Sequence, residues 1–265
     1  MSRWAFKSTF RAALVTAAVA SFVGMSGCAA APTSSYINAA GTEVTVNWKD
    51  YPAHAYSLAE EILAAPVKED AEGVSAAILD ELKDALTEEF ELQWAANGEA
   101  GWYPEQGNGY GGKAMTTTFN SVSWDSDNAP VESSDWEEIL AITNRITSAR
   151  GLGLVKLSPD AASLKNDPAW HQELLDKYGT TDPNKLYWWT GTAYANSQWL
   201  SIALVNVDRD TTGKAAAEYE KSGLPARSIS LSYGVTTVSR EDLAAFRDAL
   251  KPFEGLTPPE PTTSD

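Results

Sequence analysis

Two apolar, alternating segments in the C-terminal half constrain the fold more than any other feature of the chain. Residues 186–194 and 198–208 have the strongest strand character, and Ala195-Asn196-Ser197 between them is typical of a turn. In the second segment both alternating sets are largely apolar: Leu200, Ile202 and Leu204 on one side, and Trp199, Ala203, Val205 and Val207 on the other. We therefore expect a hairpin whose second strand is central in a sheet and covered on both faces.

The remaining periodic segments predict further strands and several amphipathic helices. Strand-like alternation covers residues 42–48, 114–124, 152–157 and 228–235. Helical spacing covers residues 57–65, 74–90, 134–146, 170–177, 213–222 and 239–250, with capping boxes at Ser57-x-x-Glu60 and Ser134-x-x-Glu137. This order indicates an α+β fold in which helices pack on one face of a mostly antiparallel sheet. A ferredoxin-like or split βαβ order with additions fits from residue 114 onward.

The N-terminal segment has the pattern of an export signal. Three basic and no acidic residues occupy positions 1–11, and an apolar run follows from Ala12 to Val23. A membrane-spanning helix needs roughly 20 apolar residues, so a signal peptide fits this segment better than a transmembrane anchor. There is no twin-arginine pair, which favours export of the unfolded chain. We therefore expect no cofactor loaded in the cytoplasm.

The next residues, Met25-Ser26-Gly27-Cys28, resemble the lipobox of bacterial lipoproteins. In that family the cysteine is lipidated and becomes the new N-terminus, so the resemblance implies a membrane anchor of acyl chains on Cys28. Ser26 and Gly27 match the small residues of the motif, whereas Met25 stands where the family usually has Leu. Cys28 is the only cysteine, so it has no partner for an internal disulfide. Secretory cleavage just after Cys28 and an uncleaved chain are the alternatives.

These features divide the chain into four parts. We expect a signal peptide over residues 1–27, a flexible tether over 28–41, a single α+β domain over 42–254, and a disordered, proline-rich tail over 255–265. The expected location is the extracytoplasmic side of the cell membrane, with the domain held close to the bilayer by the acyl chains.

The charge of the chain excludes one class of partner. Residues 28–265 contain 17 basic and 36 acidic side chains, a formal charge of −19, and residues 60–91 alone hold eleven acids against two lysines. Such a surface repels the phosphate backbone, so we expect no nucleic-acid partner. A solvated helical face explains the acidic residues of this segment, and docking of a cationic partner is the alternative.

Motifs for metal binding and catalysis are incomplete. Asp208-x-Asp210-x-Thr212-Gly213 resembles the opening of a calcium loop, but position 219 is Tyr where the closing Glu belongs, and a helix cap needs the same residues. Two histidines are too few for a zinc site of several imidazoles, and no G-x-S-x-G motif is present. We therefore expect no metal and no catalytic residues, with Asp208, Asp210 and Thr212 as weak candidates for a cation site.

Aromatic residues that the sequence pattern does not assign to the core indicate where a ligand could bind, and core packing is the alternative for those on predicted strands. The candidate binding face consists of Trp102, Tyr103, Tyr110, Trp188 and Tyr194. We expect a non-enzymatic binding or accessory module at the cell envelope, with an envelope protein or a glycan as partner. The alternatives are a wall glycan or peptide hydrolase that uses a carboxylate pair, and a two-lobed solute-binding lipoprotein of a transporter.

One segment of the predicted domain carries a second resemblance. "SISLSYGVTTVS", residues 228–239, follows a helix and an apolar strand, and in this order it is similar to the LppA-like lipoproteins of mycobacteria and related actinobacteria. The resemblance implies a lipoprotein and transfers no functional residue.

Overall fold

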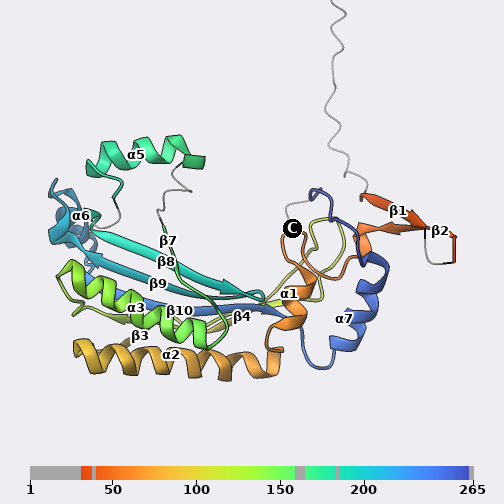
Figure 1. The fold of residues 1–265 in the computed structure, drawn as a ribbon, viewed down its shortest axis with the longest axis horizontal. Coiled ribbons are helices and arrows are strands. Elements are labelled where there is room, and N and C mark those ends of the chain that lie inside the picture. Colours follow the sequence, from red (N-terminus) through yellow and green to blue (C-terminus); the bar gives the residue numbers. More distant parts are fainter. Residues whose placement is uncertain (1–30, 38–39, 159–164, 183–184, 263–265) are drawn as a thin grey trace, which may run out of the picture. The chain divides into compact units, whose positions relative to one another are not determined.

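The computed structural model describes residues 31–37, 40–158, 165–182 and 185–262 (Figure 1). The predicted signal peptide and Cys28 lie outside these ranges. The described part contains an antiparallel sheet with helices on one side, which confirms the predicted α+β class. None of its helices is both long enough and apolar enough to cross a bilayer.

The main sheet has eight strands among the described residues, and every pairing is antiparallel. The strands are β3 (Ala95–Asn97), β4 (Gly101–Pro104), β5 (Thr117–Asn120), β6 (Ser123–Ser126), β7 (Lys156–Ser158), β8 (Trp188–Ala195), β9 (Gln198–Asn206) and β10 (Arg227–Thr237). The order is β3-β6-β10-β9-β8-β7, with β5 also on β10 and β4 on β5. The helix between β6 and β7 therefore connects two strands that β10, β9 and β8 separate, a wider form of the split βαβ order.

The hairpin predicted from the alternating segments is formed by β8 and β9. Its two-residue turn consists of Asn196 and Ser197, with φ angles of 53° and 55°. Positive φ at both residues is typical of the two-residue turns that fit the twist of paired strands. β9 lies between β8 and β10, as expected for a central strand. The prediction that both of its faces are covered is wrong, because Leu200, Ile202 and Leu204 are buried while the alternate side chains are half-exposed.

The strand predicted over residues 114–124 is divided into β5 and β6. Both pair with β10, but residues 121 and 122 leave the ladder between them. Ser121 maintains the bonding there, since its amide donates to the Tyr233 carbonyl at 2.8 Å and its hydroxyl accepts from the Tyr233 amide at 2.9 Å. A side chain that replaces a backbone group is not visible in a pattern of alternation.

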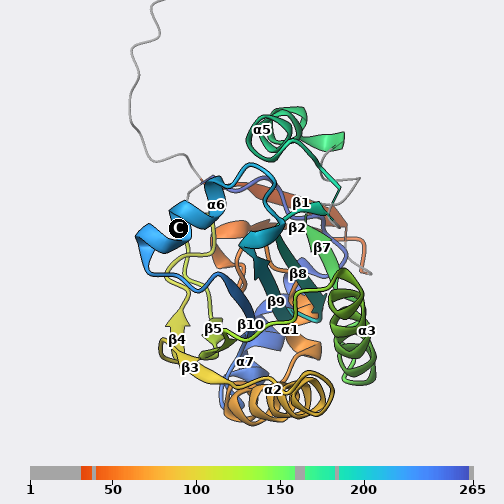
Figure 2. The same cartoon turned by 90° about the vertical axis from the view of Figure 1, so that its left-hand side faces the viewer.

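Two long helices cover one face of the sheet and complete the main core (Figures 1 and 2). They are α2 (Lys68–Phe90) and α3 (Ser133–Ala149). Their apolar side chains meet alternate residues of β9 and β10 in one buried cluster, whose members include Ile78, Leu82, Trp136, Ile139, Leu200, Ile202, Ile229, Leu231 and Val235. Two shorter helices connect strands: α5 (Pro168–Tyr178) precedes β8 in the chain, and α6 (Lys214–Ser222) precedes β10.

A second buried cluster is built from both ends of the described chain. It contains β1 (Thr33–Ile37), β2 (Glu43–Asn47), the 3-10 turn η1 (Trp48–Asp50), α1 (Ala59–Ala64), α7 (Leu243–Leu250) and the turn η4 (Lys251–Phe253). The expected tether is therefore wrong in part, because residues 33–37 pair with β2 as a strand. Ser34 and Tyr36, which alternate along β1, face the cluster. Two such residues are too few to distinguish a strand from a polar linker in the sequence.

The C-terminal segment is also ordered, which corrects the prediction of a disordered tail for residues 255–262. The Pro259 carbonyl accepts from the Tyr110 hydroxyl at 2.8 Å, and the Thr262 amide donates to the Gly109 carbonyl at 2.8 Å. Gly109 has φ +80°, and a Cβ there would lie 2.8 Å from Ala55. Proline content lowers the chance of a helix or strand but does not prevent an extended segment from docking on a core.

Candidate functional site

One candidate site is a cavity of about 710 Å³ between α1, α7 and the C-terminal segment. We call it the α1–α7 pocket. Its size lies within the roughly 300–1,000 Å³ typical of small-molecule sites. The residues that line it are Trp48, Tyr51, Leu58, Ala59, Glu60, Leu63, Arg247, Leu250, Lys251, Phe253, Glu254, Gly255, Leu256, Thr257 and Pro258. Most of these present apolar atoms, so the pocket suits a ligand with an apolar body.

Three aromatic rings form the floor of the pocket. The ring centroids of Trp48, Tyr51 and Phe253 lie 5.0 to 5.3 Å apart, all in tilted or edge-on orientations. Tilted contacts at this separation are the favourable geometry for aromatic pairs. The indole nitrogen of Trp48 also donates to the Ser34 hydroxyl at 2.9 Å, which ties the floor to β1. The floor is therefore rigid before any ligand arrives.

Asn108 holds the backbone that carries this floor. Its side chain is fully buried and forms hydrogen bonds from both ends of the amide. Nδ2 donates to the carbonyls of Trp48, Lys49 and Tyr51 at 2.8–3.1 Å, and Oδ1 accepts from the amides of Tyr110 and Gly112 at 2.9 and 3.0 Å. One side chain thus satisfies the buried backbone of two loops that are about sixty residues apart in sequence.

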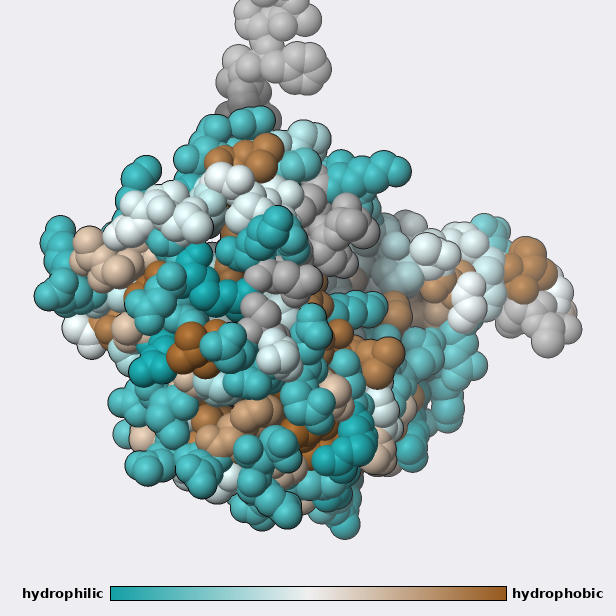
Figure 3. Space-filling view, turned by 60° about the vertical axis from the view of Figure 1, so that its left-hand side comes forward, coloured by the Kyte–Doolittle hydropathy of each residue, from teal (hydrophilic) through white to brown (hydrophobic). Residues whose placement is uncertain are grey.

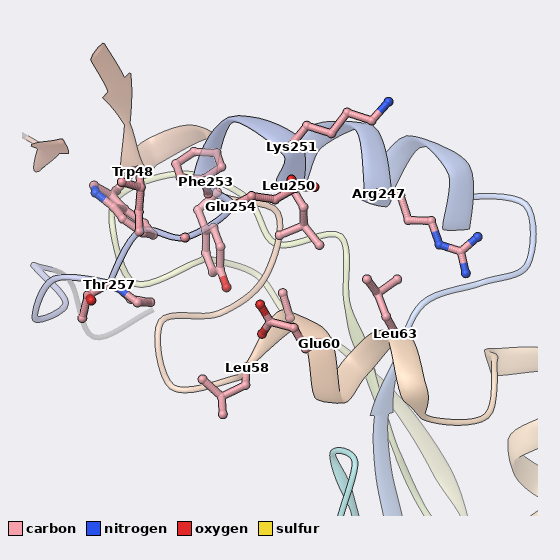
Figure 4. A pocket seen from close by; sticks show the side chains of 15 residues that line it. Trp48, Leu58, Glu60, Leu63, Arg247, Leu250, Lys251, Phe253, Glu254 and Thr257 are labelled. Carbon is pink, nitrogen blue, oxygen red and sulfur yellow. The ribbon is translucent and has the colours of Figure 1, made fainter. Parts of the chain in front are cut away.

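Glu60 points into the pocket, whereas the basic side chains Arg247 and Lys251 lie at its edges. Figure 4 shows Leu63 of α1 and Leu250 of α7 extending into the space between the two helices, with the Glu60 carboxylate nearby. Lys251 points away from the cavity, and its ammonium group pairs with Asp248 at 2.6 Å. Arg247 lies at the outer end of the pocket. A ligand with a polar head would therefore place that head at the edge and its apolar part inside.

The phenol of Tyr51 is buried in the pocket floor, away from solvent. Burial raises the pKa of Tyr51 to about 12, and the negative charge of Glu60 acts in the same direction. The folded state keeps this proton while the unfolded chain releases it near pH 10, so the folded state binds more protons between these two pH values.

We expect the free energy of unfolding to fall as the pH rises from about 10 to about 12, because of this difference in proton binding. The contribution of Tyr51 reaches about 1.4 kcal/mol per pH unit. Urea unfolding at several alkaline pH values measures the slope, and the Tyr51→Phe variant should have a shallower one. Identical slopes for the two proteins would show that Tyr51 ionises equally in both states.

The structure does not bring the five predicted binding-face residues together. Trp102, Tyr110 and Trp188 belong to three different apolar clusters. Tyr110 is only 1% exposed and packs 5.6 Å from Trp48, so its assignment to an exposed face is wrong. An aromatic residue in a glycine-rich stretch looks like part of a flexible loop until residues distant in sequence are seen to cover it.

The other members of that predicted face lie at separate places. Trp102 is half-buried on β4, and its indole nitrogen donates to Glu72 at 2.8 Å. Tyr103 and Tyr194 are each 56% exposed, and Trp188 is half-buried beside Val207 and Tyr187. A single aromatic face is therefore not present.

The weak cation candidates form a helix-start turn. The Asp210 carboxylate accepts from the Thr212 amide at 3.0 Å, from the Thr212 hydroxyl at 2.8 Å and from the Ala215 amide at 2.8 Å. Burial acts to raise the pKa of Asp210, but these donors outweigh it and hold the pKa below its usual value. Asp208 is exposed in the preceding 3-10 turn η3 (Val207–Arg209). Asp210 and Thr212 therefore stabilise the start of α6, which is the alternative role that the sequence offered for them.

The face of the molecule that Figure 3 shows has no large hydrophobic patch. Figure 3 shows one side of the molecule as mostly hydrophilic, with small hydrophobic patches that are separated from one another. Among the described residues, no three His, Cys, Asp or Glu side chains gather as a metal site requires. The α1–α7 pocket is therefore the candidate that combines size, apolar lining and a rigid floor.

Sequence reasoning missed most of this site. Asn108 and the residues from Leu250 to Pro258 were not candidates, because their role depends on contacts between segments far apart in the chain. The Asn108-Gly109 pair is a turn signal that marks this loop as structured. In comparisons with protein-family models, curated proteins and solved structures, nothing matches this chain.

Proposed function

We propose that the chain is a membrane-anchored, extracytoplasmic lipoprotein whose domain binds an amphipathic ligand in the α1–α7 pocket. The observation that carries the proposal is the pocket itself, a cavity of about 710 Å³ with a preformed aromatic floor and basic side chains at its edge. Burial of apolar ligand surface there is worth about 25 cal/mol per Å².

The small number of residues between Cys28 and β1 supports a ligand taken from the membrane. Among the described residues, Pro32 already makes a backbone contact, since its carbonyl accepts from the Trp48 amide at 2.9 Å. At roughly 3.6 Å per extended residue, the chain from Cys28 to Pro32 can span at most about 15 Å. Acyl chains on Cys28 would therefore attach the chain to a bilayer only a few residues before β1.

Two of the alternative functions receive less support. A two-lobed solute-binding protein requires two domains, whereas the described residues between 31 and 262 form one compact unit. A hydrolase requires a pair of carboxylates that converge on a substrate; Glu60 and Glu254 both line this pocket, but apolar side chains make up most of its lining. The proposal therefore assigns binding rather than catalysis to the site.

Blocking the pocket should abolish uptake of a hydrophobic probe. We expect a dansyl-labelled fatty acid to bind the wild-type protein saturably and the Leu63→Trp variant at least tenfold more weakly. The larger side chain displaces two or more methylene groups of the probe, at about 0.8 kcal/mol each. Fluorescence titration gives both affinities, and Leu250→Trp tests the opposite wall.

Leu154→Trp is the matched control, since Leu154 is 64% exposed and lines none of the described cavities. Equal affinities for the wild-type protein and both pocket variants would contradict the assignment of the site.

A further inference from the structure

One wall of the α1–α7 pocket is a segment with neither helix nor strand. Residues 254–258 line the cavity, and the chain continues from them to Thr262 as irregular backbone. We call residues 255–262 the C-terminal strap. Each of its residues is exposed or half-buried, in contrast to Trp48 in the pocket floor, which is fully buried. Figure 4 places Thr257 of the strap at the opposite end of the cavity from Arg247.

Two hydrogen bonds hold the far end of the strap. The Tyr110 hydroxyl donates to the Pro259 carbonyl at 2.8 Å, and the Thr262 amide donates to the Gly109 carbonyl at 2.8 Å. Residues 257–258, which lie at the cavity, form no hydrogen bond with any other residue that the structure describes. The strap is therefore held mainly at its ends, and breaking two bonds would free the far one.

The loop that receives the strap is rigid. Tyr110 is 1% exposed, and its ring centroid lies 5.6 Å from that of Trp48 and 6.4 Å from that of Tyr51. The buried side chain of Asn108 accepts hydrogen bonds from the amides of Tyr110 and Gly112. Because the loop is packed and hydrogen-bonded in this way, the strap is the partner that moves when the two bonds break.

The near end of the strap contains a residue that can act as a hinge. Gly255 has a φ angle of +76°, a left-handed conformation that glycine adopts without strain. A Cβ at this position would have no neighbour within 4 Å, so the backbone there is not confined by other side chains. Phe253, two residues earlier, is buried in the second cluster. Rotation at Gly255 would therefore move the strap and leave the pocket floor in place.

We propose that the C-terminal strap is a gate, which closes the α1–α7 pocket while it is bonded to Tyr110 and Gly109 and admits or releases the ligand when those bonds break. The inference rests on the proposed function of the pocket and adds the step that controls exchange of the ligand. Leu256 of the strap lines the pocket and also packs on the cluster beneath it, so an open strap uncovers apolar surface. The rate of ligand exchange then follows the fraction of time that the strap is open.

Tyr110→Phe tests the gate, because it removes the hydroxyl that donates to Pro259 and keeps the aromatic ring. Loss of one such bond changes an equilibrium constant about two- to tenfold. Stopped-flow fluorescence on the full chain gives the rate constants for association and dissociation of the dansyl-labelled fatty acid. Both should rise by about this factor, while the Kd should change less than about twofold because the two rates rise together.

Tyr103→Phe is the matched control, since Tyr103 is 56% exposed and lines none of the described cavities. Its rate constants should equal those of the wild type.

Hydrogen exchange of the ligand-free protein, followed by mass spectrometry, measures opening of the strap without a probe. The amides of residues 256–262 should exchange about two- to tenfold faster in Tyr110→Phe than in the wild type. The α7 amides, among them that of Phe246, which donates to the Asp242 carbonyl at 2.8 Å, should exchange at the same rate in both proteins.

The outcomes distinguish failure of the gate from failure of the pocket. Saturable binding of the probe with unchanged rate constants in Tyr110→Phe would overturn the gate and leave the assignment of the pocket intact. Unchanged exchange of residues 256–262 in that variant would also overturn the gate. A wild-type protein that bound no probe would instead refute the proposed function of the pocket, and the gate with it.

Discussion

The Asn108→Ala variant is expected to lose about 4 kcal/mol of unfolding free energy and to lose the α1–α7 pocket with it. Each buried backbone group left without a partner costs about 1–3 kcal/mol, and the Tyr51 carbonyl and the Tyr110 amide, both buried, would lose the partner that Asn108 provides. The loops that contain Trp48 and Tyr110 are bound together by this side chain, so the aromatic floor should become disordered. Urea unfolding followed by circular dichroism measures the loss.

Two further variants separate hydrogen bonding from shape. Asn108→Asp keeps the size of the side chain but removes its donors, and it should be about as destabilising as Asn108→Ala. Asn97→Ala removes an exposed amide that makes one bond, to Asp125 at 2.6 Å, and should cost less than about 1 kcal/mol. A loss at Asn108 no larger than the loss at Asn97 would contradict the role assigned to Asn108.

The Cys28→Ser variant is expected to leave the membrane fraction and to incorporate no labelled acyl chain. Each methylene of an acyl anchor contributes about 0.8 kcal/mol of membrane binding, and two chains anchor a protein stably. No helix among the described residues is long and apolar enough to cross a bilayer. Fractionation of cells and metabolic labelling with a fatty acid measure the two effects.

Met25→Leu is the control for the membrane experiment, because it restores the residue that lipoboxes usually have at this position. It should be lipidated at least as well as the wild type. Cys28→Ser protein that remained in the membrane fraction would refute the lipobox interpretation.

The parts of the fold that follow a regular period were predictable from the sequence. The alternation of Ile229, Leu231, Tyr233 and Val235 predicted β10, and all four side chains are buried. The hairpin of β8 and β9 and the long helix α2 followed from the same kind of pattern, because burial on one face imposes a period of two or of about 3.6 residues.

The candidate site was not predictable in this way. The pocket floor joins Trp48, Asn108 and Phe253, which come from three segments with no shared period. Trp48 ends the strand predicted over residues 42–48, but nothing local distinguishes an aromatic residue under a pocket from one in a closed core. The order of the C-terminal segment was not predictable for the same reason, because Leu256 and Pro259 are held by partners distant in sequence.

The most direct test of the central claim is native mass spectrometry of the full chain, extracted from the expressing cells in detergent. The account predicts a bound amphipathic molecule on the wild-type protein and on Leu154→Trp, which organic solvent extracts, and its absence from Leu63→Trp. A wild-type protein without any adduct, or the same adduct on all three proteins, would contradict the assignment of the α1–α7 pocket as a binding site.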